Sequence, residues 1–177
     1  MKPVLPRRAS RRLDFRLRTY GITAALGVFT MGGVVPQCEP PPPPPVVQVA
    51  DVQSAVVSTV NQHRAQAGKA GVVVDGRLTA AAQGHSDDMA RRQTMTHSGG
   101  DGTDGGQRIR NAGYGWTTWA ENVAAGQSTP AEVMSAWMNS SGHRANILNG
   151  GVSHIGVAAT TGSNGVTYWT MVLAAGG

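Results

Sequence analysis

The sequence predicts an α+β domain over residues 51–177. Apolar residues recur at helical spacing in the first half of this region, whereas residues 155–160 and 166–172 form two strand patterns around a Gly162–Gly165 turn. Helices that come first and a hairpin that comes last are typical of an α+β fold, because a parallel sheet would require strands and helices to alternate.

Two helices are expected at the start of the domain. The first covers residues 51–67 and ends at Gly68; its apolar face consists of Val52, Ala55, Val56 and Val60. Asp75 is the predicted N-cap of the second, which runs to about Arg92. Its apolar face consists of Leu78, Ala81, Ala82, His85 and Met89. The interpretation favoured for His85 is therefore a packed core or cleft-wall histidine.

The middle of the domain is predicted to be a long loop followed by two further helices. Glycine and aspartate dominate the early part of residues 94–119, where a short helix over 106–112 is the one element expected. Thr129, Pro130 and Glu132 then form a helix start, with Thr129 as N-cap and Glu132 completing a capping box. Ser141 is the predicted N-cap of a short helix that carries His143.

An export leader is predicted before the domain. Residues 1–19 are rich in arginine, and the fifteen residues 21–35 are uncharged and mostly apolar, which is the layout of a secretory signal. Residues 1–36 are accordingly a signal sequence or an N-terminal membrane anchor. Residues 37–50, with six consecutive prolines, are a proline-rich linker, and residues 51–177 are the domain. The domain is expected to be secreted or extracytoplasmic, with membrane contact only through the N-terminal segment.

Charge and cysteine content exclude some functions for the domain. Residues 1–50 hold seven basic and two acidic residues, whereas residues 51–177 hold eight of each, so the net charge of +5 lies in the leader. A domain without net positive charge is not expected to bind nucleic acid. The single cysteine, Cys38, precedes the domain, which excludes an internal disulfide and a thiolate zinc cluster there.

Glu121 is the acidic residue most in need of a partner. It stands in the apolar, strand-like segment Trp119–Ala125, and burial of an unpaired carboxylate is costly. Its partners would be histidine, arginine, backbone N–H groups or a metal ion. The nearest candidates in character are His97, which follows a threonine-rich loop edge, and His143, near the start of a short helix. His154 has no partner at ligand spacing and stays unassigned.

Several ordered motifs resemble one known family over residues 54–173. They are Val60–Arg64, Asp75–Leu78, His85–Ala90, Thr96–Ser98, Arg108–Tyr114, Glu121–Ala124, Trp137–Leu148, Ile155–Val157 and Tyr168–Thr170. In this order and spacing they resemble the CAP superfamily of cysteine-rich secretory proteins, insect venom antigen five and plant pathogenesis-related proteins. The bacterial SCP-like branch is the most similar.

The resemblance implies an α–β–α sandwich with a small antiparallel sheet and a cleft built around two histidines and two glutamates. Carried over to this sequence, the cleft residues are His97, Glu121 and His143, and Ser140 stands where the family has its second glutamate. Two histidines and one carboxylate can hold Zn²⁺ with a position left open, so His97, His143 and Glu121 are a tentative zinc set.

Other roles for these residues are open. Glu121 could orient a ligand histidine or act as a general base. Glu121 could pair with His143 and stabilise the fold without a metal. Ser140 or Ser141 could form a catalytic triad with His143 and Glu121, although Ser141 as a helix cap is the favoured interpretation.

The favoured function is an extracellular binding module whose cleft receives a lipid, a peptide or another envelope ligand. The alternative is a metal-dependent extracellular hydrolase that acts on peptide or cell-wall material through the same cleft. A non-enzymatic role is favoured, since one of the four family cleft residues is absent.

Overall fold

The computed structural model describes residues 49–176, which contain five helices and four strands. The helices are α1 (Val49–Gln66), α2 (Gly76–Arg92), α3 (Gly105–Asn111), α4 (Pro130–Asn139) and α5 (Ser141–Ile147). The strands are β1 (Val73–Val74), β2 (Trp116–Ala125), β3 (His154–Thr161) and β4 (Thr167–Gly176). The predicted leader and the proline run lie outside the described residues. Within those residues, none of the helices has the length and apolar character needed to span a bilayer.

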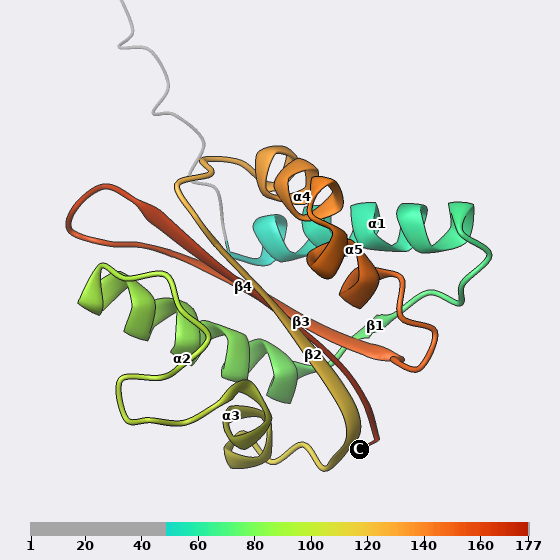
Figure 1. Cartoon of the computed structure of the whole chain (residues 1–177), viewed down its shortest axis with the longest axis horizontal. Helices are drawn as coiled ribbons and strands as arrows, with labels where there is room; N and C mark the ends of the chain where they lie inside the picture. Colours follow the sequence, from blue (N-terminus) through green and yellow to red (C-terminus); the bar gives the residue numbers. More distant parts are fainter. Residues whose placement is uncertain (1–48, 177) are drawn as a thin grey trace, which may run out of the picture. The chain divides into compact units, whose positions relative to one another are not determined.

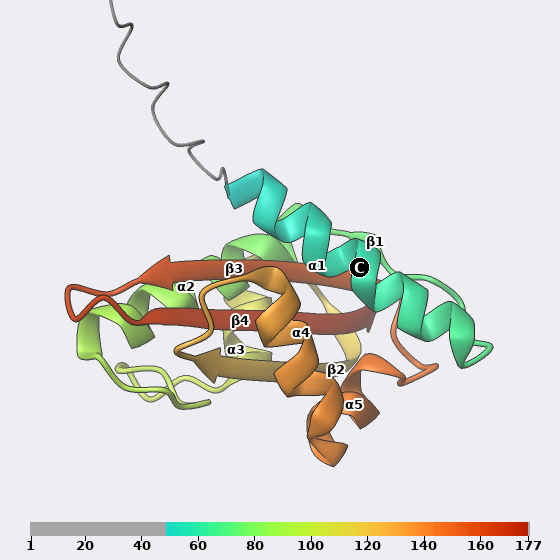
Figure 2. The same ribbon diagram turned by 90° about the horizontal axis from the view of Figure 1, so that it is seen from above.

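The four strands form one sheet in the order β1-β3-β4-β2. Both β3–β4 and β4–β2 are antiparallel, and β3–β4 is the predicted hairpin, whereas the two residues of β1 pair in parallel with β3. Helices α1, α4 and α5 lie on one side of this sheet, and α2 and α3 lie on the other (Figures 1 and 2). The predicted α+β class is confirmed, with a sheet that is mixed because of its edge strand β1.

Successive side chains of β4 point to opposite faces of the sheet and contribute to the core on both sides. Met171 and Leu173 pack with α1, α4 and α5, in a cluster that includes Trp137. Val172 and Ala174 face the other way and pack with residues of α2 and α3. Successive side chains of a strand point to opposite faces, so a strand covered on both faces is apolar at consecutive positions. This explains the unbroken apolar run at the end of the sequence.

Helix α2 approaches β3 most closely at Gly156. A Cβ atom built on Gly156 would overlap the backbone of Leu78 and Thr79, so no larger residue fits between helix and sheet. The helix begins where predicted: Asp75 accepts a hydrogen bond from the Arg77 backbone N–H at 2.9 Å. This end of α2 is therefore held both by its cap and by direct backbone packing on the sheet.

The starts of helices α4, α5 and α3 agree only in part with the caps predicted from the sequence. Thr129 caps α4 as predicted, but Glu132 accepts from the Ser128 backbone N–H and does not complete a capping box. The N-cap position of α5 is held by Ser140, without a side-chain cap bond, so the assignment of Ser141 as cap was wrong by one residue. A reciprocal capping box does occur in α3, between Asp104 and Gln107.

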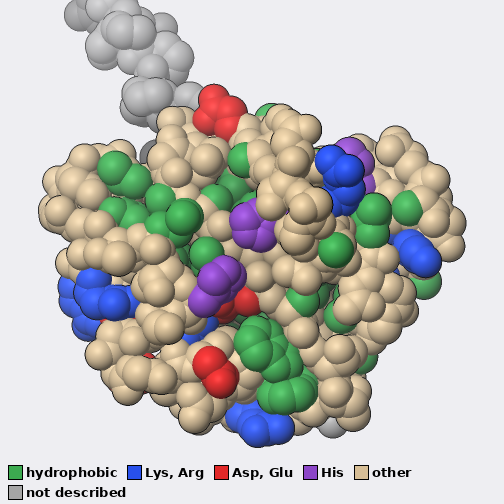
Figure 3. Space-filling view, viewed as in Figure 1, with side chains coloured by type: hydrophobic (Ala, Val, Ile, Leu, Met, Phe, Trp, Pro, Cys, Tyr) green, Lys and Arg blue, Asp and Glu red, His purple; other side chains and the backbone are tan. Residues whose placement is uncertain are grey.

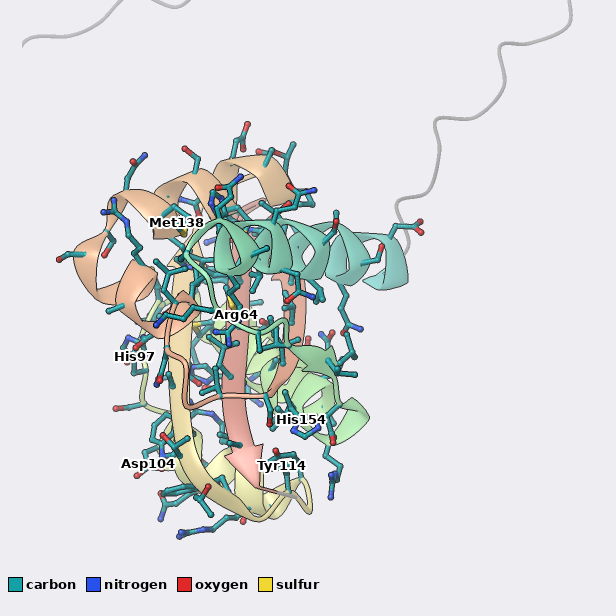
Figure 4. All side chains as sticks on the ribbon, turned by 90° about the vertical axis from the view of Figure 1, so that its right-hand side faces the viewer. Arg64, His97, Asp104, Tyr114, Met138 and His154 are labelled. Atoms are coloured by element: carbon teal, nitrogen blue, oxygen red, sulfur yellow. The ribbon has the colours of Figure 1, made fainter. Side chains whose placement is uncertain are left out.

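Arg64 joins the end of α1 to the segment that precedes β3. Its side chain is fully buried, and its guanidinium donates to four backbone carbonyls. The acceptors are Ala70 (2.7 Å), Ile147 (2.7 Å), Asn149 (2.8 Å) and Val152 (3.2 Å). Burial lowers the pKa of Arg64, but an arginine remains charged, so these carbonyl dipoles are what compensate its charge. Figure 4 shows Arg64 below α1.

Candidate functional site

Glu121 lies at the centre of the site, on the edge strand β2. Its side chain is 3% exposed, and both of its oxygens are engaged within the protein. Arg108 of α3 donates to Oε2 at 2.7 Å, and His97 donates from Nδ1 to Oε1 at 2.9 Å. The strand pattern and the need for a cationic or histidine partner were both predicted from the sequence. The hypothesis that Glu121 pairs with His143 is not what the structure shows.

The loop that carries His97 is held in place by three long side chains. The carbonyl of Thr96 accepts from His85 Nε2 at 2.8 Å, that of His97 from Arg108 at 2.9 Å, and that of Ser98 from Arg92 at 2.8 Å. Arg108 thus binds both the carboxylate and the backbone beside His97. Most residues of this loop are exposed, so these hydrogen bonds set the position of the imidazole.

The ring of His97 is the exposed part of the site, with a side chain that is 60% exposed. Its Nδ1 must carry the proton donated to Glu121, since an ionised carboxylate can only accept. Within the described part of the chain, Nε2 has no hydrogen-bond partner. The carboxylate therefore orients the ring and leaves Nε2 for an external group.

Helix α5 carries His143 and lies on the other side of the sheet from α3. The carbonyl of His143 accepts from Asn122 at 3.1 Å, and Asn146 bonds Asn122 at 2.8 Å, so α5 is fixed to the strand next to Glu121. The pKa of His143 is lowered by burial and, to a smaller extent, by the nearby His97. Figure 3 shows two histidine side chains near the middle of one face, with acidic atoms beside one of them.

The titration of His143 tests this proximity. We expect its pKa to lie below the ordinary value of about 6.5, because burial and a second imidazole both disfavour the charged form. His97→Ala should raise that pKa without restoring it fully, since burial is the larger cause. Histidine ring proton shifts followed by NMR across pH 4–8 would measure both values. An unchanged His143 pKa in His97→Ala would show that the two rings do not interact.

None of the remaining candidate residues is hydrogen-bonded to Glu121 or to the ring of His97. Ser140 is half-buried at the junction of α4 and α5, and its hydroxyl makes no bond that caps α5. His85 is fully buried, 4.0 Å from Glu121 Oε1, and burial lowers its pKa. His154 on β3 is 2.9 Å from the Tyr114 hydroxyl. Figure 4 shows His154 beside Tyr114 and apart from His97.

The donor set offers no preformed three-ligand metal site. Among residues 49–176, no three histidine, cysteine, aspartate or glutamate side chains are placed to hold one ion. Glu121 uses both oxygens on Arg108 and His97, so it would have to give up a buried ion pair to ligate. The geometry suits Glu121 as an orienting group for His97 and does not suit it as a third zinc ligand.

Arg108 was not predicted from the sequence as the specific partner of Glu121. The residue stands in a short helix within a glycine-rich segment, and it is only the fold that places α3 under β2. The capping box formed by Asp104 and Gln107 was a usable signal, because it would have placed the helix start one residue earlier, at Gly105, and Arg108 in its first turn.

The chain is similar to proteins of one family. It matches the model of the cysteine-rich secretory protein (CAP) family over residues 57–173. The uncharacterised protein YkwD of Bacillus subtilis is 37% identical over 109 residues, which cover 62% of this chain and 42% of that protein.

Two solved structures of bacterial proteins are similar as well. An extracellular protein with an SCP domain from Bacillus anthracis has 24% identity and a TM-score of 0.65, covering 71% of this chain and 40% of that one. An outer surface protein from Borrelia burgdorferi has 20% identity and a TM-score of 0.65, covering 70% and 92%. These two similarities show the fold alone. The chain spans less than half of YkwD and of the Bacillus anthracis protein.

Proposed function

Because this chain belongs to the cysteine-rich secretory protein (CAP) family, we propose that it is an extracellular binding module whose ligand contacts the surface formed by His97 and His143. The similar proteins of known location are an extracellular protein and an outer surface protein, which supports a place outside the cytoplasm. The predicted export leader is consistent with the same location.

The proposal rests on the two hydrogen bonds that Glu121 accepts, from Arg108 and from His97. Its charge is compensated by Arg108 at 2.7 Å, and its side chain is almost fully buried. A general base must reach the proton that it abstracts, and this carboxylate is buried, with each oxygen already accepting a hydrogen bond from the protein. What remains accessible is the ring of His97, a neutral or cationic hydrogen-bonding group. Such a surface suits a polar ligand with amide groups, such as an envelope peptide.

A metal-dependent hydrolase is the second candidate, and one observation favours it. A carboxylate bonded to Nδ1 orients a histidine for use through Nε2, as it does in many metal and general-base sites. Within the described residues, however, no hydroxyl or thiol is hydrogen-bonded to His97 Nε2, and no third metal ligand is in place. The binding module is therefore better supported.

Cosedimentation with purified bacterial cell-wall sacculi and with phospholipid vesicles tests the proposal. We expect the full chain to be retained on sacculi, and His97→Ala to weaken retention about fivefold, which corresponds to one lost hydrogen bond of about 1 kcal/mol. His63→Ala, on α1, is the matched control and should bind as the unmodified chain does.

The supernatant of the same experiment separates the two candidates. A binding module releases no soluble fragments from the sacculi. Release that is abolished by His97→Ala, in a variant that keeps its circular dichroism spectrum, would establish a hydrolase instead. Retention on neither sacculi nor vesicles would refute the binding module.

A further inference from the structure

Strand β2 forms one edge of the sheet, so one side of its backbone has no neighbouring strand. Ala174 on β4 directs its carbonyl at the segment that leads into β3, so the residue before it, Leu173, directs its peptide groups at β2. Leu173 is in register with Ala120. Because the peptide groups of successive residues in a strand point to opposite sides, those of Trp119 and Glu121 point away from the sheet.

Part of this free edge is already covered by the protein. Asn146 of α5 donates to the carbonyl of Glu121 at 3.3 Å, and Trp137 of α4 donates to the carbonyl of Val123 at 3.3 Å. Residues 121–124 are buried. Side chains of α4 and α5 therefore occupy the place that a further strand would need beside the second half of β2.

The edge is open next to this covered part, at Trp119. Residues 117–120 are exposed or partly exposed. Among residues 49–176, no group beyond the sheet is hydrogen-bonded to the N–H or the carbonyl of Trp119, or to the N–H of Glu121. Unpaired backbone groups along an edge strand are a template for pairing with another strand.

The open edge belongs to the face that carries the histidines. Strand β2 is the strand nearest the viewer in Figure 1, so its free edge opens onto the face that Figure 3 shows from the same direction. The ring of His97 bonds Glu121 at the face of the sheet that α3 covers, and α5, with His143, is fixed to β2 at the other face. The free edge therefore runs between the two histidines.

Trp119 and Asp104 determine which side chains suit this edge. A Cβ atom built on Gly105 would lie 2.6 Å from the ring of Trp119 and 3.1 Å from Oε2 of Glu121, so the start of α3 packs directly against both. Asp104, the N-cap of α3, has no cationic partner in the described part of the chain. Figure 4 shows Asp104, like His97, on the side of β2 away from β4. A lysine there can lay its alkyl stem on the indole and its ammonium beside the carboxylate.

We propose that the ligand of the histidine surface is an extended, lysine-containing peptide that pairs with β2 at Trp119 as an additional strand. This inference rests on the proposed binding function and adds how the ligand is held. In such pairing, backbone hydrogen bonds supply affinity, and alternate side chains, here those beside Trp119 and Asp104, supply specificity.

Amide hydrogen exchange of the ¹⁵N-labelled full chain tests the pairing. The probe is a six-residue peptide of alternating lysine and valine, acetylated and amidated at its ends. We expect a Kd on the order of 0.1–1 mM. At saturation, exchange should slow at least about tenfold at the amides of Trp119 and Glu121, which gain acceptors. Exchange at Ala120 and Asn122, whose amides already face β4, should not change.

Two N-methylated versions of the peptide, each with one alternate set of amides blocked, separate strand pairing from non-specific adhesion. A strand pairs with β2 through one of its own edges, so one version should bind at least about tenfold more weakly and the other within about twofold of the parent peptide. Asp104→Ser keeps a capping residue and removes the charge. It should weaken the lysine peptide about threefold and leave a glutamine version of the peptide unaffected.

Three outcomes would overturn the strand pairing: no binding up to about 10 mM peptide, binding without slower exchange at Trp119 and Glu121, or equal affinity of the two N-methylated versions. Retention on sacculi that His97→Ala weakens would still support the binding module in each of these cases. Failure of the strand pairing and failure of the proposed function are therefore distinguishable.

Discussion

Replacement of Arg64 by alanine is expected to lower the free energy of unfolding by about 4 kcal/mol, the largest effect of any single change considered for this domain. The substitution removes a fully buried side chain and leaves four carbonyls, those of residues 70, 147, 149 and 152, without their donor. A typical domain has only about 5–15 kcal/mol of stability, so much of it would be lost. Urea denaturation followed by tryptophan fluorescence measures the change.

Two further variants separate the role of the fork-shaped guanidinium from that of charge. Arg64→Lys keeps the charge, but a single ammonium cannot reach carbonyls on three sides, so we expect it to recover less than half of the loss. Arg144→Ala, at an exposed arginine with one backbone bond to Met138, should cost less than about 1 kcal/mol. If Arg64→Ala were as stable as Arg144→Ala, the four carbonyls would have found other partners and our account of this residue would be wrong.

Glu121→Ala is expected to lower the free energy of unfolding by about 3 kcal/mol. The change leaves the guanidinium of Arg108, whose side chain is 12% exposed, without its carboxylate, and it removes the acceptor of His97. Since Arg108 also holds the carbonyl of His97, we expect the loop of residues 94–98 to become mobile. Amide hydrogen exchange in this loop should rise together with the loss of stability.

A double-mutant cycle identifies the source of this loss. Arg108→Met should cost about 2 kcal/mol alone, and adding it to Glu121→Ala should cost much less than the sum, because the unpaired charge is then gone. Additive effects, within about 0.5 kcal/mol, would mean that Glu121 and Arg108 do not stabilise each other. Arg110→Met, at an exposed residue of the same helix, serves as the control for the arginine change.

Local signals in the sequence were enough to locate most of the elements. Asp75 and Thr129 were identified as caps because a cap depends on residues within one turn, and both accept the expected bonds. The hairpin from β3 to β4 was likewise predicted from alternation and a glycine-containing turn. Helix α3 was placed one residue late, since the glycines around Asp104 concealed its cap.

Contacts between distant segments could not be predicted in the same way. The partner type of Glu121 was deduced from the cost of burying a charge, but the choice between His143, His97 and Arg108 depends on which elements the sheet brings together. Arg64 stands in a motif that resembles the family, yet nothing near it in sequence indicates a buried residue, because three of its acceptors lie more than 80 positions later.

The close packing of α2 on β3 at Gly156 also affects residues farther along α2. Leu78, which packs against Gly156, and His85 lie seven residues apart on the same face of α2. The contact at Gly156 therefore determines how α2 is positioned on the sheet. A methyl group added at Gly156 would tilt α2 and move the imidazole of His85 relative to the carboxylate of Glu121 on β2. The distance between His85 and Glu121 therefore depends on Gly156, although neither residue lies on β3.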